Sequence, residues 1–165
     1  MAKMRVRLAE SDEDWRLVKN AVDIDITACG GEAFKSVKDL EEYVDADDIG
    51  PVLVEADGKP IGAAVFHEKT LPTFPAPAVD IIIFSVLPEF KEKNAEVDCL
   101  DAVVEWTRSK RKNATIEIFT TASNENAIST YEKSGFEKAY SGMNGLGLQF
   151  IAYKNIPSKT LKIED

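Results

Sequence analysis

Cysteine and histidine are scarce in this sequence, and their scarcity excludes several kinds of chemistry. The 165 residues contain two cysteines, Cys29 and Cys99, and a single histidine, His67. The cysteines are seventy positions apart without C-x-x-C spacing, which fits a reducing compartment better than a disulfide scaffold. One histidine and no G-x-S-x-G motif give no basis for a Ser-His-Asp hydrolase. We expect no metal at the functional site.

Long apolar runs and an excess of basic charge are also missing. The longest apolar stretch runs from Val79 to Leu87 and contains Asp80 and Ser85, so it falls far short of the ~20 residues that span a bilayer. The first ten residues lack the apolar core of a signal peptide, and we expect a cytoplasmic protein.

The charge of the chain narrows the choice of partners. Twenty Lys and Arg against 29 Asp and Glu give a formal net charge of -9. A surface of this sign repels phosphate backbones and anionic lipids, so we expect neither nucleic acid nor a membrane as a partner. It would attract cations such as protonated amines, although solubility is the simpler interpretation of the charge.

The remaining composition is that of one ordinary globular domain, residues 1–165, with a charged tail over 154–165. The Asp57-Gly58 pair predicts a tight hairpin, and the strand over 79–86, apolar on both faces, should be central in its sheet. Patterning and caps predict the order β α α β β β α β α β β. Strands are predicted around Val6 and Leu8 and over 51–56, 61–68, 79–86, 115–120, 136–140 and 146–154, and helices over 12–22, 36–44, 96–110 and 124–134.

Two neighbouring segments carry features beyond those of a plain domain. Residues 86–96 run from a strand end through a short loop to a helix N-terminus, where unpaired N–H groups and the helix dipole favour an anion. Residues 124–136 place Asn, Ala, Tyr, Gly and Phe at fixed spacing on one capped helix. Residues of this helix could instead have ordinary structural roles: Asn124 as the N-cap, Gly135 as the C-cap, Phe136 as its hydrophobic contact and Tyr131 as a core tyrosine. Together they indicate a functional helix.

The pattern N-x-x-A-x-x-x-Y-E-K-x-G-F over 124–136 resembles the second signature of the GCN5-related N-acetyltransferase superfamily, whose members transfer an acyl group from acyl-coenzyme A to an amine. The element order matches over about residues 4–153. The resemblance implies an α+β fold with a mixed, V-shaped seven-stranded sheet and helices on both faces. Coenzyme A would lie in the splay between the strands that end at Val86 and Thr120.

The same resemblance implies roles for individual residues. Phe84 and Val86 would bond the pantetheine through their backbones, Asn124 would hold its lower part, and Tyr131 would act as the general acid near the sulfur. Acetyl-CoA is therefore the expected acyl donor.

The loop of the first segment departs from the first signature of that superfamily. Val86, Pro88 and the basic Lys91 match, but Glu92, Asn94 and Glu96 stand where glycines are usual. Side chains obstruct the close approach of backbone amides to a pyrophosphate, and carboxylates compete with it for the helix dipole. We therefore expect weak binding of acetyl-CoA through Phe84, Val86, Lys91, Glu92, Lys93, Asn94, Ala95, Glu96 and Asn124.

Acyl transfer also needs a base, because an ammonium cannot attack a thioester. Asp80, six residues before Val86, resembles the position of the glutamate base in histone-type members, and Glu117 is a weaker candidate. Asp80 could instead be a solvated carboxylate at the entrance of a strand. Covalent catalysis by Cys29 or Cys99 is not required.

The acceptor is expected to be a small-molecule or protein amine. In this fold the first two helices border the acceptor side, where a group of acids could steer cationic amines or could simply be a solvated helix end: Glu41, Glu42, Asp45, Asp47 and Asp48.

Two functions remain open from the sequence. The first is direct acetyl transfer, and the alternative is a catalytically degenerate relative that binds a protein or metabolite without coenzyme A. The loop over 91–96 discriminates between them, and a homodimer is compatible with both.

Overall fold

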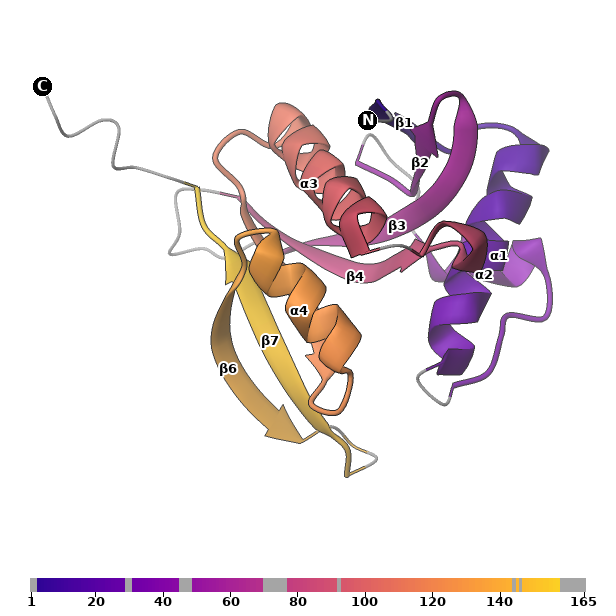
Figure 1. Ribbon diagram of the computed structural model, residues 1–165. Coiled ribbons are helices and arrows are strands. Elements are labelled where there is room, and N and C mark those ends of the chain that lie inside the picture. Colours follow the sequence, from indigo (N-terminus) through magenta and orange to yellow (C-terminus); the bar gives the residue numbers. More distant parts are fainter. Residues whose placement is uncertain are drawn as a thin grey trace, which may run out of the picture.

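The chain folds around one seven-stranded sheet with helices on both faces, which confirms the predicted α+β class and element order (Figure 1). The computed structural model describes residues 3–28, 31–44, 49–69, 77–91, 93–143, 145 and 147–157, without the side chains of 28, 69, 93 and 94. The elements are β1 (Met4–Leu8), α1 (Asp12–Ala28), α2 (Val37–Tyr43), β2 (Val52–Ala56), β3 (Lys59–Lys69), β4 (Ala78–Val86), the 3-10 turn η1 (Pro88–Phe90), α3 (Lys93–Lys110), β5 (Thr115–Thr121), α4 (Glu125–Lys133), β6 (Glu137–Met143) and β7 (Gln149–Asn155).

The strand order is β1-β2-β3-β4-β5-β7-β6, so the apolar strand β4 is central, as predicted. All neighbours are antiparallel except β4 and β5, which are parallel. The predicted hairpin joins β2 to β3: Ala56 pairs with Lys59, and Asp57 and Gly58 have φ angles of 52° and 80°. Two successive left-handed residues match the twist of the flanking strands.

Helices cover both faces of the sheet (Figure 1), and each face carries its own apolar core. Burying one such side chain contributes about 1.5–3 kcal/mol. On one face α1 and α2 cover β2, β3 and β4 through a buried set that includes Trp15, Val18, Val22, Leu40, Leu53 and Val65. On the other face α3 and α4 pack over a set that includes Val54, Ile81, Leu100, Val103, Ile116 and Ile118.

The parallel pair β4 and β5 is short. The two strands pair only from Ala78 with Thr115 to Ile81 with Ile118. A β-bulge follows on β4, since Val65 of β3 faces Ile83 and its neighbour Phe66 faces Ile81, and the extra residue Ile82 is 38% exposed. Beyond this point the described parts of β4 and β5 diverge, which gives the sheet its expected V shape.

Two helix boundaries differ from the prediction. Helix α1 continues to Ala28 instead of ending at Val22, and α3 begins at Lys93 instead of at residue 96. The residues Asp23-Ile24-Asp25-Ile26-Thr27 are weak helix formers, but Ile26 packs on the core of this face. Tertiary packing therefore outweighs local propensity here.

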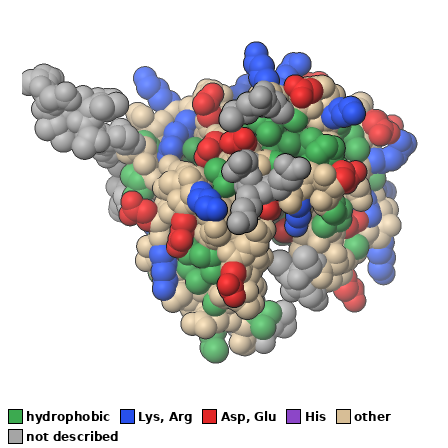
Figure 2. Space-filling model, viewed as in Figure 1, with side chains coloured by type: hydrophobic (Ala, Val, Ile, Leu, Met, Phe, Trp, Pro, Cys, Tyr) green, Lys and Arg blue, Asp and Glu red, His purple; other side chains and the backbone are tan. Residues whose placement is uncertain are grey.

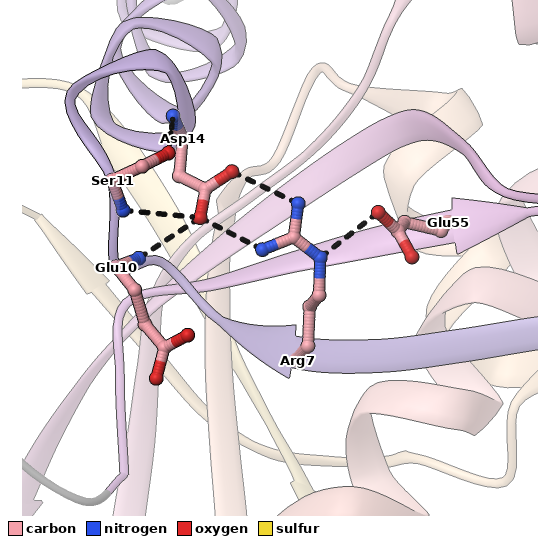
Figure 3. A network of polar contacts seen from close by, with 5 residues as sticks. All are labelled: Arg7, Glu10, Ser11, Asp14 and Glu55. Atoms are coloured by element: carbon pink, nitrogen blue, oxygen red, sulfur yellow. Dashed lines mark hydrogen bonds and ion pairs between the residues drawn. The ribbon is translucent and has the colours of Figure 1, made fainter.

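A polar network fixes the first turn of α1 to the sheet edge (Figure 3). Arg7 of β1 donates to both oxygens of Asp14, at 2.7 and 2.9 Å, and its Nε donates to Glu55 of β2 at 2.9 Å. Asp14 also accepts the backbone N–H groups of Glu10 and Ser11, and Ser11 Oγ caps the helix by accepting the N–H of Asp14. No helix within the described ranges is long and apolar enough to cross a membrane.

Candidate active site

A cleft opens where β4 and β5 diverge, and it is lined from both faces of the sheet. Asp25 of α1 lies on one face, and Asn124 and Tyr131 of α4 lie on the other. In Figure 2 the molecule is notched between the part that contains α4 and the part that contains α1. Six of the predicted site residues meet in this cleft: Phe84, Val86, Lys91, Glu96, Asn124 and Tyr131.

Helix α4 owes its position to caps that belong to the predicted signature. Asn124 is the N-cap, and its Oδ1 accepts the backbone N–H of Ala127 at 3.1 Å. At the other end Gly135 has a φ of 87°, its N–H bonds the carbonyl of Glu132, and the N–H of Phe136 bonds the carbonyl of Tyr131 at 3.0 Å. This is a Schellman cap, whose left-handed residue favours glycine. The signature therefore has a structural role as well as a place in the cleft.

Tyr131 is held by aromatic neighbours. Its ring centroid lies 6.2 Å from that of Phe136 and 5.8 Å from that of Tyr153. The ring is buried, and its hydroxyl donates a long hydrogen bond of 3.5 Å to the carbonyl oxygen of Phe119, on the diverging part of β5. The core therefore fixes the ring while the residue lines the cleft.

Lys91, which follows η1, and Glu96, in the first turns of α3, also line the cleft. Asn126 of α4 donates to both carboxylate oxygens of Glu96, at 3.2 and 3.3 Å. Ala95 is on the same helix but is not among the lining residues. Glu92 lies outside the described residues, as do the side chains of Lys93 and Asn94.

The two predicted bases lie side by side on β4 and β5, one residue before the residues of these strands that line the cleft. Asp80 of β4 and Glu117 of β5 are Cα partners, both are buried, and Asp80 also faces His67 of β3. Glu117 accepts a hydrogen bond of 3.4 Å from the hydroxyl of Tyr140 and lies 3.7 Å from Lys154 Nζ. Neither acid is among the described residues that line the cleft.

Asp25 was missed by the sequence analysis. It lies on the part of α1 beyond the predicted helix end, it is half-buried, and burial raises its pKa to about 6 in spite of the opposing effect of Lys91. The spacing of Val18, Val22 and Asp25 places this acid on the apolar stripe only once the helix is known to continue past Val22.

Cys99, Glu41 and Glu42, which the structure describes, do not line the cleft. Burial raises the pKa of the Cys99 thiol to about 12, which keeps it protonated in the core. Cys29, Asp45, Asp47 and Asp48 lie outside the described residues, whereas Glu41 and Glu42 are exposed on α2. Among the described residues no three His, Cys, Asp or Glu side chains are grouped to hold a metal ion.

Comparison with known proteins agrees with this geometry. The family model described as acetyltransferase (GNAT) family matches residues 19–136, well over half of the chain. A search of curated proteins finds no match. Several solved structures share the fold at low sequence identity.

YncA of Salmonella typhimurium, solved with its cofactor acetyl-CoA, has a TM-score of 0.73 at 15% identity, and the match covers 94% of this chain and 95% of that one. A ribosomal-protein-alanine N-acetyltransferase from Brucella melitensis has a TM-score of 0.72 at 13% identity, over 93% and 99% of the two chains. Arabidopsis thaliana Naa50, in complex with a bisubstrate analogue, has a TM-score of 0.66 at 20% identity, over 93% and 99%. With its signature helix, its splayed sheet and this family match, the chain belongs to the acetyltransferase (GNAT) family.

Proposed function

We propose that the protein is an N-acetyltransferase that moves the acetyl group of acetyl-CoA to an amine by direct attack. The observation that carries this proposal is the cleft at the divergence of β4 and β5, where Asn124, Tyr131 and Lys91 meet beside a strand edge. From Ile82 onward the β5-facing edge of β4 has no strand partner among the described residues, so its backbone groups can bond an extended ligand.

The residues of the cleft suit acetyl-CoA in most respects. The pantetheine would follow β4 at Phe84 and Val86, and the Nδ2 group of Asn124 can donate to it because Oδ1 serves the helix cap. Lys91 and the N-terminus of α3, with Lys93 and Ala95 in its first turn, would face the phosphates. The negative charge of Glu96 would repel the phosphates, although its carboxylate accepts a hydrogen bond from Asn126. When bound, acetyl-CoA supplies an acetyl thioester, which is open to attack by an amine nitrogen.

Tyr131 would give its hydroxyl proton to the leaving sulfur, because it is the phenol that lines the cleft. The proposed base of the sequence analysis, Asp80, lies one strand pair before the divergence, and so does Glu117. Neither acid lines the cleft, so proton removal by either one would need a connecting chain of water molecules. The whole reaction would take place in the cytoplasm, the compartment that the sparse cysteines favour.

The acceptor would approach from the face of the sheet that carries α1. On this side three rings of β5, β6 and β7 meet edge to face, with centroids 5.9 to 6.4 Å apart: Phe119, Tyr140 and Phe150. Phe119 is 37% and Tyr140 44% exposed, and Phe119 also lines the cleft. This apolar surface next to the cleft supports an acceptor whose amine is attached to an apolar body, in a small molecule or a peptide.

A calorimetric titration with acetyl-CoA, followed by a thiol-release assay with a panel of amines, tests the proposal. We expect saturable binding and thiol release that depends on the amine. Binding weaker than about 1 mM together with no turnover would favour the alternative, a relative that binds another ligand in this cleft. The carboxylate of Glu96 is the feature that supports this alternative.

A further inference from the structure

We propose that Asp25 is the acceptor-binding carboxylate of this cleft, and that it holds the ammonium group of the acceptor and removes its proton. This inference rests on the proposed transfer of an acetyl group to an amine. It assigns the task of the base to α1, whereas the sequence analysis assigned it to β4.

The placement of the acids leads to this assignment. Of the described residues that line the cleft, only Asp25 and Glu96 are acids. Glu96 lies on the face of the sheet that carries α3, and its two oxygens accept hydrogen bonds from Asn126. Asp25 approaches from the opposite face. Phe119 points to that same face, because Ile118 beside it in β5 packs in the core under α3, and Tyr140 contacts the ring of Phe119. A carboxylate on that side can meet a cation that enters over the rings. Glu117 also lies beside the rings, but its carboxylate already accepts from Tyr140 and lies 3.7 Å from Lys154 Nζ.

The surroundings of Asp25 suit a proton acceptor. Within the described part of the chain its carboxylate accepts no side-chain hydrogen bond, although it is half-buried. The charged or titratable groups that line the cleft with it are Lys91 beyond η1, Glu96 of α3 and Tyr131 of α4. Burial holds the pKa of Asp25 at about 6, close to the range in which a base works well at neutral pH.

Asp25 and Tyr131 together account for every proton that moves during the transfer. Asp25 takes one proton from the ammonium, which frees the nitrogen lone pair, and later releases that proton to solvent. The nitrogen then forms a bond to the thioester carbonyl carbon as the carbon–sulfur bond breaks. Tyr131 gives its hydroxyl proton to the sulfur. Its oxygen then receives a second proton, which the nitrogen loses as the amide forms. One proton is released per turnover.

The test compares the parent with Asp25→Asn, Asp25→Glu, Asp80→Asn and Asp12→Asn, the last being a control at an exposed acid in the first turn of the same helix. The assay measures kcat/KM for 2-phenylethylamine between pH 5 and 9 and the Kd of acetyl-CoA. Calorimetry measures the binding of 2-phenylethylamine and of uncharged 2-phenylethanol to each variant, independently of turnover.

We expect Asp25→Asn to lower kcat/KM by about 100-fold, to remove the acidic limb of the pH profile and to weaken binding of the amine but not of the alcohol. The Kd of acetyl-CoA should stay within about threefold, and Asp25→Glu should regain part of the activity. If Asp80→Asn removes the limb while Asp25→Asn keeps it, the inference is wrong. If the parent has no turnover, the proposed function fails. Weaker amine binding in Asp25→Asn would then still support the role of Asp25 in holding the amine. Amine binding that is unchanged in Asp25→Asn would overturn the inference.

Discussion

Asp25 of α1 and Tyr131 of α4 line the same cleft from opposite faces of the sheet. This is only feasible because β4 and β5 stop pairing after Ile81 and Ile118, so the sheet is open between the two helices. The network around Asp14 fixes the rotation of α1, because Asp14 and Asp25 are eleven positions apart, about three turns, and lie on nearly the same face of the helix. The anchor at one end of α1 therefore orients the carboxylate at the other.

Replacing Asp25 with Asn should stabilise the protein at neutral pH. The pKa is about 6 in the folded chain against about 3.8 when unfolded, so folding disfavours the ionised form. The neutral acid contributes its full stability below pH 3.8, and this contribution is lost as the pH rises through 6. At pH 7.5 we expect Asp25→Asn to raise the free energy of unfolding by about 2 kcal/mol, with almost no difference at pH 4.

Urea unfolding of both proteins at the two pH values measures this effect, with Asp12→Asn as the control. Equal stability of the parent and Asp25→Asn at pH 7.5 would mean that the carboxylate is well solvated. A gain in stability together with a loss of activity is the usual signature of a functional group kept in an unfavourable environment.

Tyr131→Phe should lower kcat by about 100-fold and leave the Kd of acetyl-CoA nearly unchanged, because only the proton donor is removed. The ring would keep its contacts with Phe136 and Tyr153, and the lost hydrogen bond to Phe119 is long. Stability should therefore change by less than about 1 kcal/mol. Tyr153→Phe, which also removes a buried hydroxyl, is a matched control outside the cleft. Full turnover in Tyr131→Phe would leave the residue a role in packing only.

Glu96→Gln should tighten the binding of acetyl-CoA by about fivefold, or ~1 kcal/mol. The substitution removes a negative charge from the end of the cleft that would face the phosphates, while the remaining amide oxygen can still accept from Asn126. Isothermal titration at low and high salt measures the effect, which should shrink as salt screens the charge. Glu89→Gln, an exposed acid on η1, is the control. Unchanged affinity in Glu96→Gln would show that its charge does not reach the ligand.

Local patterns predicted α4 and its caps well, because the contacts that begin and end this helix lie within thirteen residues of sequence. Asn124 caps one end, Gly135 turns the other, and Phe136 packs on Tyr131, so spacing alone specifies the geometry. The hairpin at Asp57-Gly58 was predictable for the same reason.

Features that depend on packing between distant segments could not be predicted in this way. The insertion of β7 between β5 and β6 is set by pairing across the sheet. The position of Asp80 relative to Val86 was known from sequence, but the point at which β4 leaves β5 was not. Asp25 was missed because the last turns of α1 form only against the core that Ile26 contacts. Knowledge of the helix end would have placed this acid on the apolar stripe.

The network at the other end of α1 makes a prediction about acid stability. Arg7→Ala should destabilise the protein by about 2–3 kcal/mol at pH 7, because it removes three charge-assisted hydrogen bonds and leaves the carboxylates of Asp14 and Glu55 without their cation. The guanidinium holds the pKa of Asp14 far below its ordinary value. A lowered folded pKa stabilises above about pH 4 and loses that stabilisation as the pH falls further. The difference between parent and Arg7→Ala should therefore shrink below pH 4.

Arg16→Ala is the matched control for this experiment. Arg16 lies on the same helix and its Nη1 is 3.1 Å from Glu13, but both side chains are about two-thirds exposed, at 65% and 67%. Water and salt screen such a pair, so its loss should cost less than about 0.5 kcal/mol at any pH. Urea unfolding of the three proteins from pH 2.5 to 7 distinguishes the pairs. If Arg7→Ala and Arg16→Ala behaved alike, the buried network would not be what anchors α1. The orientation of Asp25 would then have to come from the apolar contacts of the helix, among them those of Val18 and Val22.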